Sequence, residues 1–147
     1  MTDRQRLVIE HPVHVPFYDV DSMEVVWHGN YLKYFEEARC ALLNHIDYNY
    51  EAMRDSGFAW PVVDVRIKYI KPLRFNQHVI VHVELTEWEN RLRLDYEILD
   101  SKTREKLTTA YSIQVAVDMK QQELQFVLPD IFRQKIARCL SSGNKPG

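Results

Sequence analysis

Between Asn30 and His45 the sequence reads NYLKYFEEARCALLNH, and its apolar side chains recur at steps of three and four residues. This spacing places them on one face of an α-helix, so the pattern predicts a helix over residues 30–45 with one side packed in a core. We expect Gly29 or Asn30 to begin this helix with a non-helical backbone. The apolar face comprises Tyr31, Tyr34, Phe35, Ala38, Ala41, Leu42 and His45.

After this helix the sequence changes to an alternation of apolar and polar residues. Alternation of this kind indicates strands with one buried and one wet face, and the short polar junctions between the stretches favour antiparallel pairing. One long helix packed on an antiparallel sheet of about five strands is an α+β arrangement. The expected strands cover residues 9–17, 63–72, 79–85, 92–98 and 109–117, and further helices are expected at 49–57 and 129–140.

The composition suits one domain with a sizeable core, because the 147 residues are 46% hydrophobic and 27% charged. No repeat or linker interrupts residues 7–140, which we expect to form a single domain. Residues 1–6 and 141–147 are expected to be flexible termini. Because the edge strands of such a sheet can pair with another copy, a homodimer is expected.

Several classes of protein are disfavoured. The net charge of −2, with Lys and Arg scattered, gives no basic surface for nucleic acid. No apolar run approaches the ~20 residues that span a membrane, and the N-terminus does not resemble a secretory signal, so we expect a cytoplasmic protein. The histidines and the two cysteines show no metal-site spacing, and neither a serine-hydrolase elbow nor a phosphate loop is present. We expect no metal and no cofactor.

Residues 17–31, which join the first strand to the long helix, mix acids with large apolar groups. At a helix N-terminus several backbone N–H groups lack partners and the dipole favours negative charge. An N–H of His28 or Gly29 could therefore stabilise the oxyanion formed when a thioester is attacked, with Asp21 as base or nucleophile. A thiolate, whose parent thiol has a pKa of ~8.5, leaves without a strong acid. The alternative is that Asp19 and Asp21 only cap a turn or lie in water.

The run from Asp19 to Tyr31, DVDSMEVVWHGNY, resembles the D-x-D-x-x-G-x-V-[WY]-[HY]-x-x-Y signature of the 4-hydroxybenzoyl-CoA thioesterase family. The resemblance covers about residues 7–118 and implies the hot-dog fold. It implies that Asp21 is the catalytic carboxylate and that the backbone N–H of His28 binds the thioester carbonyl. It also implies homodimers, often paired into homotetramers, with acyl-CoA at the subunit interface. One departure stands out, since the family's glycine falls on Glu24, which narrows the acyl pocket or changes the loop path.

The expected function is therefore that of a hydrolase, an acyl-CoA thioesterase with catalytic Asp21 and His28. CoA is then part of the substrate, and Trp27, Gly29 and Tyr31 are the expected substrate-binding residues. The alternatives are a non-catalytic hot-dog module that binds an acyl carrier, and a hot-dog hydratase or dehydratase that uses His28 with Asp21. A second hot-dog branch uses a carboxylate of the long helix, but Glu36 and Glu37 fall outside its apolar face. The sequence leaves open the acyl group, and CoA versus an acyl carrier protein.

Overall fold

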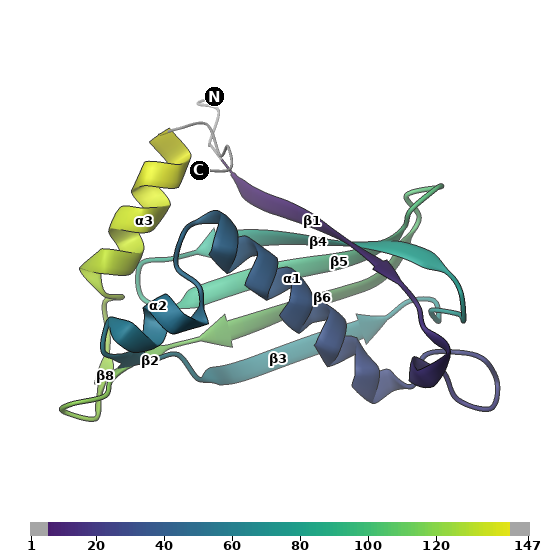
Figure 1. Cartoon of the computed structure of the whole chain (residues 1–147), viewed down its shortest axis with the longest axis horizontal. Coiled ribbons are helices and arrows are strands. Elements are labelled where there is room, and N and C mark those ends of the chain that lie inside the picture. Colours follow the sequence, from purple (N-terminus) through teal and green to yellow (C-terminus); the bar gives the residue numbers. More distant parts are fainter. Residues whose placement is uncertain (1–5, 142–147) are drawn as a thin grey trace.

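The computed structural model describes residues 6–141 and shows the predicted α+β fold. A five-stranded antiparallel sheet in the order β1-β4-β5-β6-β3 carries a long helix, α1, across one face (Figure 1). Residues 1–5 and 142–147 lie outside the described residues, and with them nearly all of the two termini predicted to be flexible. The main elements are β1 (Leu7–His14), α1 (Tyr31–His45), β3 (Val62–Tyr69), β4 (His78–Glu87), β5 (Leu92–Asp100) and β6 (Lys106–Gln114).

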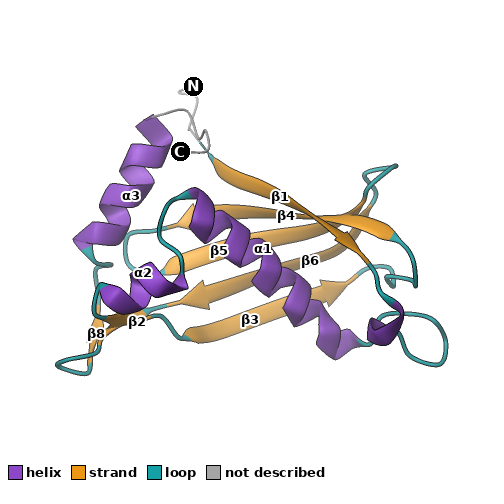
Figure 2. Ribbon diagram, viewed as in Figure 1, coloured by secondary structure: helices purple, strands orange, loops and turns teal. Residues whose placement is uncertain are grey.

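The core lies between α1 and the sheet. Alternate residues of β5 point toward the helix and are buried, as the alternation predicts, and Figure 2 shows α1 lying across the strands. The rings of Phe35 in α1 and Tyr96 in β5 lie 4.7 Å apart, and the Tyr96 hydroxyl hydrogen-bonds the Ser112 hydroxyl at 2.8 Å. A buried polar group costs little when it is paired in this way. From α1 the core includes Tyr31, Tyr34, Phe35, Ala38, Leu42 and Leu43.

Smaller elements close one end of the sheet. The predicted second helix is α2 (Tyr50–Asp55), which Asn49 caps by accepting the Ala52 N–H at 2.9 Å. The prediction of one strand over residues 109–117 is wrong: the Val115 N–H bonds the Pro61 carbonyl at 3.2 Å, and the chain turns into a second sheet. That sheet has the order β2-β7-β8, and Phe132 of the closing helix α3 packs its ring against Tyr48 and Trp60. These elements are β2 (Phe58–Ala59), β7 (Ala116–Asp118), β8 (Glu123–Gln125) and α3 (Asp130–Ser141).

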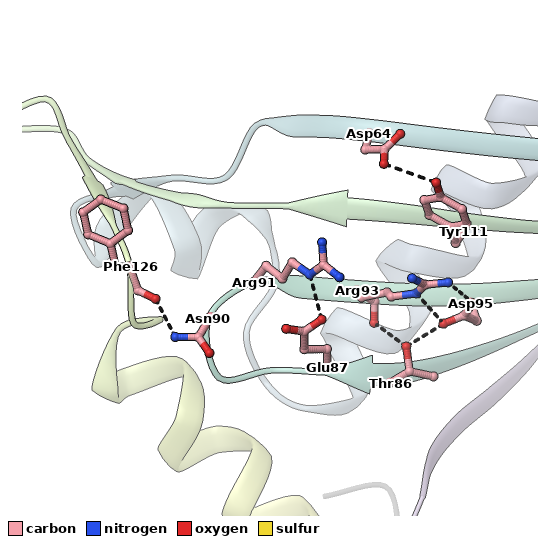
Figure 3. A network of polar contacts seen from close by, with 9 residues as sticks. All are labelled: Asp64, Thr86, Glu87, Asn90, Arg91, Arg93, Asp95, Tyr111 and Phe126. Atoms are coloured by element: carbon pink, nitrogen blue, oxygen red, sulfur yellow. Dashed lines mark hydrogen bonds and ion pairs between the residues drawn. The ribbon is translucent and has the colours of Figure 1, made fainter.

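The opposite face of the sheet carries a network of polar side chains (Figure 3). Arg93 donates to both carboxylate oxygens of Asp95 at 3.1 Å, and its guanidinium lies 4.4 Å from the centre of the Tyr111 ring. The Tyr111 hydroxyl of β6 donates to Asp64 of β3 at 3.2 Å, and this bond links the edge strand β3 to its neighbour. This is the wet face that the alternation predicts, since charged heads remain in solvent while their stems cover the strands.

The two edges of the five-stranded sheet differ. At the β1 edge, Pro12 lacks the N–H that a further strand would need. At the β3 edge, apolar side chains on the helix side of the sheet are uncovered: Val62 and Val65, which pair with the buried Gln114 and Ser112 of β6, are each 41% exposed. The expectation of one buried face therefore fails for β3 in the single chain, because only Ile67 is partly buried. The β3 edge is the one suited to pairing.

Candidate functional site

The loop of residues 19–30, named here the acidic loop, leaves the end of β1 and returns to the start of α1. The predicted first strand does not extend to Phe17, because Phe17–Asp19 form a 3₁₀ turn. Val20 then pairs with Val26 across a tight reversal. The loop is fixed to the segment before β4, since the Val26 N–H bonds the Leu73 carbonyl at 2.8 Å and the Phe75 N–H bonds the Glu24 carbonyl at 3.0 Å. Two backbone hydrogen bonds therefore hold the acidic loop against this segment.

Asp21 lies at the turn of the acidic loop with its side chain exposed. Its Oδ1 accepts the Met23 N–H at 2.9 Å and the Val25 N–H at 3.4 Å, the bonding of an Asx turn. Its Oδ2 accepts no hydrogen bond from any residue between 6 and 141. The carboxylate is therefore oriented by its own loop, with one oxygen open to a ligand.

The start of α1 differs from the expectation. Asn30 has a helical backbone and no capping bond, because a 3₁₀ turn over His28–Asn30 runs directly into the helix. Within the described part of the chain, no acceptor pairs with the N–H of His28 or of Gly29. These two N–H groups precede a 15-residue helix whose dipole makes this end partly positive. They are available to an oxyanion.

The structure does not bring Asp21 and His28 into contact, since no hydrogen bond or ion pair joins them within residues 6–141. The carboxylate and the free N–H groups lie toward the two ends of one loop. Their convergence on one carbonyl carbon stays a prediction.

Trp27 lies directly over Gly29. A Cβ added to Gly29 would lie 2.1 Å from Cζ3 of the indole, so only glycine allows the ring this position. The ring is 53% exposed beside the free N–H groups, where a substrate could contact it. The sequence predicts both residues to bind substrate. The structure shows that the position of the Trp27 ring requires a glycine at residue 29.

We predict that Gly29→Ala displaces the Trp27 indole and raises KM for a hydrolysed acyl-CoA about tenfold, the loss of roughly 1.4 kcal/mol of binding. Intrinsic tryptophan fluorescence reports the displacement, and steady-state kinetics report KM. Trp27→Ala is the matching variant and should raise KM by a similar factor. An unchanged KM in both would remove Trp27 from the substrate site.

Tyr31, the other predicted substrate-binding residue, is buried. Its hydroxyl accepts the Leu73 N–H at 3.2 Å, and its ring meets the Tyr69 ring edge-on at 4.7 Å. The Tyr69 hydroxyl in turn donates to the His28 carbonyl at 3.1 Å. Tyr31 therefore supports the wall of the site from behind, and Tyr69 of β3 is a contact that sequence reasoning missed.

Asp19, not Asp21, is the acid in contact with the long helix. It is buried, Tyr34 donates to its Oδ2 at 2.7 Å, and Lys33 pairs with its Oδ1. Sequence reasoning missed this cluster, although a signal was present: helical side chains lean toward the N-terminus, so Lys33 and Tyr34 cover the space ahead of the helix. Asp21, two positions on, is exposed instead.

Glu24, which stands where the family has glycine, has a φ of 61°. This is the left-handed region, which costs a residue with a Cβ roughly 1–2 kcal/mol. The loop thus keeps the backbone shape that a glycine adopts readily. Glutamate in place of glycine therefore changes the side chain at the tip of the loop, while the backbone keeps the left-handed conformation.

Glu24→Gly is expected to raise the free energy of unfolding by up to about 1 kcal/mol, because the relieved strain exceeds the added chain entropy of glycine. Urea unfolding measures this change. Gln122→Gly, at a φ of 55° in the turn between β7 and β8, is the matched control and should stabilise similarly. A loss of stability in Glu24→Gly alone would mean that the Glu24 side chain holds the loop.

A cavity of about 440 Å³ lies between β1 and α1, with Asp19, Lys33 and Tyr34 in its wall. Among residues 6–141, no three His, Cys, Asp or Glu side chains gather closely enough to hold a metal ion. Over the same residues no helix is long and apolar enough to cross a membrane.

The long helix on a five-stranded antiparallel sheet, entered through an acidic loop, defines a hot-dog fold of the thioesterase type. Residues 15–137 match the thioesterase-like superfamily, and the chain belongs to that family. The resemblance noted in the sequence is confirmed at this level.

Individual proteins support the assignment. YneP of Bacillus subtilis is 34% identical over 76 residues, which are 52% of this chain and 55% of YneP. The acyl-CoA thioester hydrolase YbgC of Escherichia coli O6:H1 is 29% identical over 75 residues, 51% of this chain and 56% of YbgC. The chain spans about half the length of these curated relatives.

Among solved structures, Slr0204, a 1,4-dihydroxy-2-naphthoyl-CoA thioesterase from Synechocystis, superimposes with a TM-score of 0.79. The two chains are 22% identical, and the match covers 88% of this chain and 96% of Slr0204. At this identity the likeness establishes the shared fold.

Proposed function

We propose that this protein is an acyl-CoA thioesterase, which hydrolyses an acyl thioester to the free acid and CoA. Asp21 acts as the base or nucleophile, and the backbone N–H of His28 polarises the carbonyl, with Gly29 beside it as a second donor. One observation carries the proposal: in a member of the thioesterase-like superfamily, a single loop presents an open carboxylate oxygen and two unpaired N–H groups at a helix start.

The chemistry requires little beyond these groups. Attack on the carbonyl carbon places negative charge on oxygen, which N–H donors at a positive helix end stabilise. The leaving thiolate is a weak base and needs no strong acid. Trp27 and Gly29 form the wall beside the reacting carbon and Tyr31 supports it from behind, with CoA as part of the substrate and no separate cofactor.

We also propose that the working unit is a homodimer formed through β3, in which the acidic loop of one chain approaches the other chain's substrate, and that dimers can pair further.

The register of the two β3 strands follows from the pairing of opposite charges. In an antiparallel pair with its two-fold axis at Val65, Asp64 of each chain lies opposite Arg66 of the other, on the outer face. On the helix side, Val65 of each chain then faces its counterpart, so apolar surface that is exposed in one chain becomes covered.

The first test is whether purified protein releases free thiol from a panel of acyl-CoAs that spans short, long and aromatic acyl groups. A thiol reagent measures the release continuously, and acyl-pantetheine or acyl carrier protein substrates decide which carrier is preferred. Turnover of at least one acyl-CoA is the expected result. Inactivity over the whole panel, with thioester bound intact, would overturn the proposal and favour the non-catalytic binding module.

A further inference from the structure

Asp19 is a buried acid that the proposed reaction does not use. Its side chain is only 3% exposed, yet it is held by the Tyr34 hydroxyl at 2.7 Å and by the Lys33 ammonium. A carboxylate buried in this way is costly unless it is paired and hydrogen-bonded. Burial, and then the neighbouring carboxylate, raise the pKa of Tyr34, so its hydroxyl keeps the proton that it donates.

The backbone carbonyl of the same residue holds the far end of the acidic loop. It accepts the Trp27 N–H at 3.1 Å and the side-chain amide of Asn30 at 2.9 Å. Trp27 precedes and Asn30 follows the two residues with free N–H groups, His28 and Gly29. Both flanks of the proposed oxyanion site are therefore fastened to one carbonyl oxygen, whose own residue is clamped to α1.

We infer that Asp19 is a positioning residue: its carboxylate, held by Lys33 and Tyr34, fixes the carbonyl that sets the orientation of the His28 and Gly29 peptide groups. The inference rests on the proposed function for its effect on rate. Oxyanion donors act over about 2.7–3.1 Å, so a small displacement of these peptides weakens transition-state binding more than substrate binding. The expected signature is a fall in kcat with little change in KM.

Two variants test this inference. Tyr34→Phe removes one hydroxyl from the Asp19 carboxylate, and Asp19→Asn removes its charge. For a hydrolysed acyl-CoA we expect kcat to fall about 10- to 100-fold, with KM within about threefold of wild type. In ¹⁵N-labelled protein the amide resonances of His28 and Gly29 should move. Asp55→Asn is the matched control, since this acid at the end of α2 is 74% exposed, pairs among residues 6–141 with Arg54 at 3.6 Å, and should change neither measurement.

The outcomes separate clearly. If Tyr34→Phe and Asp19→Asn fold, keep the wild-type kcat and leave both amide resonances in place, Asp19 is a structural residue and the inference is wrong. If Asp19→Asn does not fold, Tyr34→Phe decides, because it deletes a single oxygen. If wild-type protein hydrolyses no thioester, the proposed function fails, while the two resonances in Tyr34→Phe still decide whether Asp19 orients these peptides.

Discussion

Asp21→Asn is expected to lower kcat for acyl-CoA hydrolysis by about 10²- to 10⁴-fold, the range that a positioned base contributes. The amide has nearly the same shape as the carboxylate, but it can neither take a proton from water nor attack the acyl carbon. The loss should fall on kcat, with KM nearly unchanged, because the group acts on the reacting carbon and not on the CoA portion.

The Asp21→Asn substitution should remove the charge without changing the conformation of the loop. The Oδ1 atom of Asp21 accepts two N–H groups of its own loop, and the carbonyl oxygen of asparagine can accept the same bonds. The loop should therefore keep its path, and thermal unfolding should confirm an unchanged fold. Asp55→Asn is the matched control: Asp55 lies at the end of α2, is 74% exposed and, among residues 6–141, pairs only with Arg54, so turnover should not change. Wild-type turnover in Asp21→Asn would eliminate Asp21 as the catalyst.

The main elements of the fold could be predicted from the sequence because each has a clear period. The apolar residues of α1 recur at helical spacing, and those of β4 and β5 alternate except at Ile80 and Leu99, so most of their burial follows from position alone. The short strands β7 and β8 span only three residues each, too few for a period to show. The pairing of β7 with β2, and of β8 with β7, depends on where the chain turns after β6, which is a tertiary effect.

The candidate site was predictable in part. Residues of the acidic loop could be identified by their order before the helix, but their burial could not. Asp19 is buried because Lys33 and Tyr34 reach back from the helix to neutralise and bond it, whereas Asp21, two positions on, bonds only its own loop. The uncapped helix start was also unexpected: the side-chain NH₂ of Asn30 donates to the Asp19 carbonyl, and its amide oxygen accepts no helical N–H.

The second large effect is expected at the β3 edge, where Val65→Glu should separate the dimer and with it most of the activity. With the two-fold axis at Val65, the two introduced carboxylates would face each other directly in a surface that pairing buries. Burying unpaired charge costs several kcal/mol, so we expect the dimer dissociation constant to rise at least about 10²-fold. Sedimentation velocity measures the dissociation, and turnover at the same protein concentrations measures the activity.

Two controls separate this interface from others. Met119→Glu places the same charge on an apolar side chain that is 57% exposed near β8, and it should leave the dimer intact. Val8→Glu alters the β1 edge, where Pro12 already hinders pairing, and it should also leave the dimer intact. A dimer that dissociates in Val8→Glu but persists in Val65→Glu would place the interface on the opposite edge.

A mixture of two variants tests the register itself. Val65→Lys alone should dissociate for the same reason as Val65→Glu, but a heterodimer of the two brings a lysine opposite a glutamate and should form again. Because this rescue requires each Val65 to face its counterpart, a register centred elsewhere on β3 would not give it. Activity that returns with the heterodimer would show that the second chain completes the site, whereas a re-formed but inactive heterodimer would show that Val65 itself contacts the substrate.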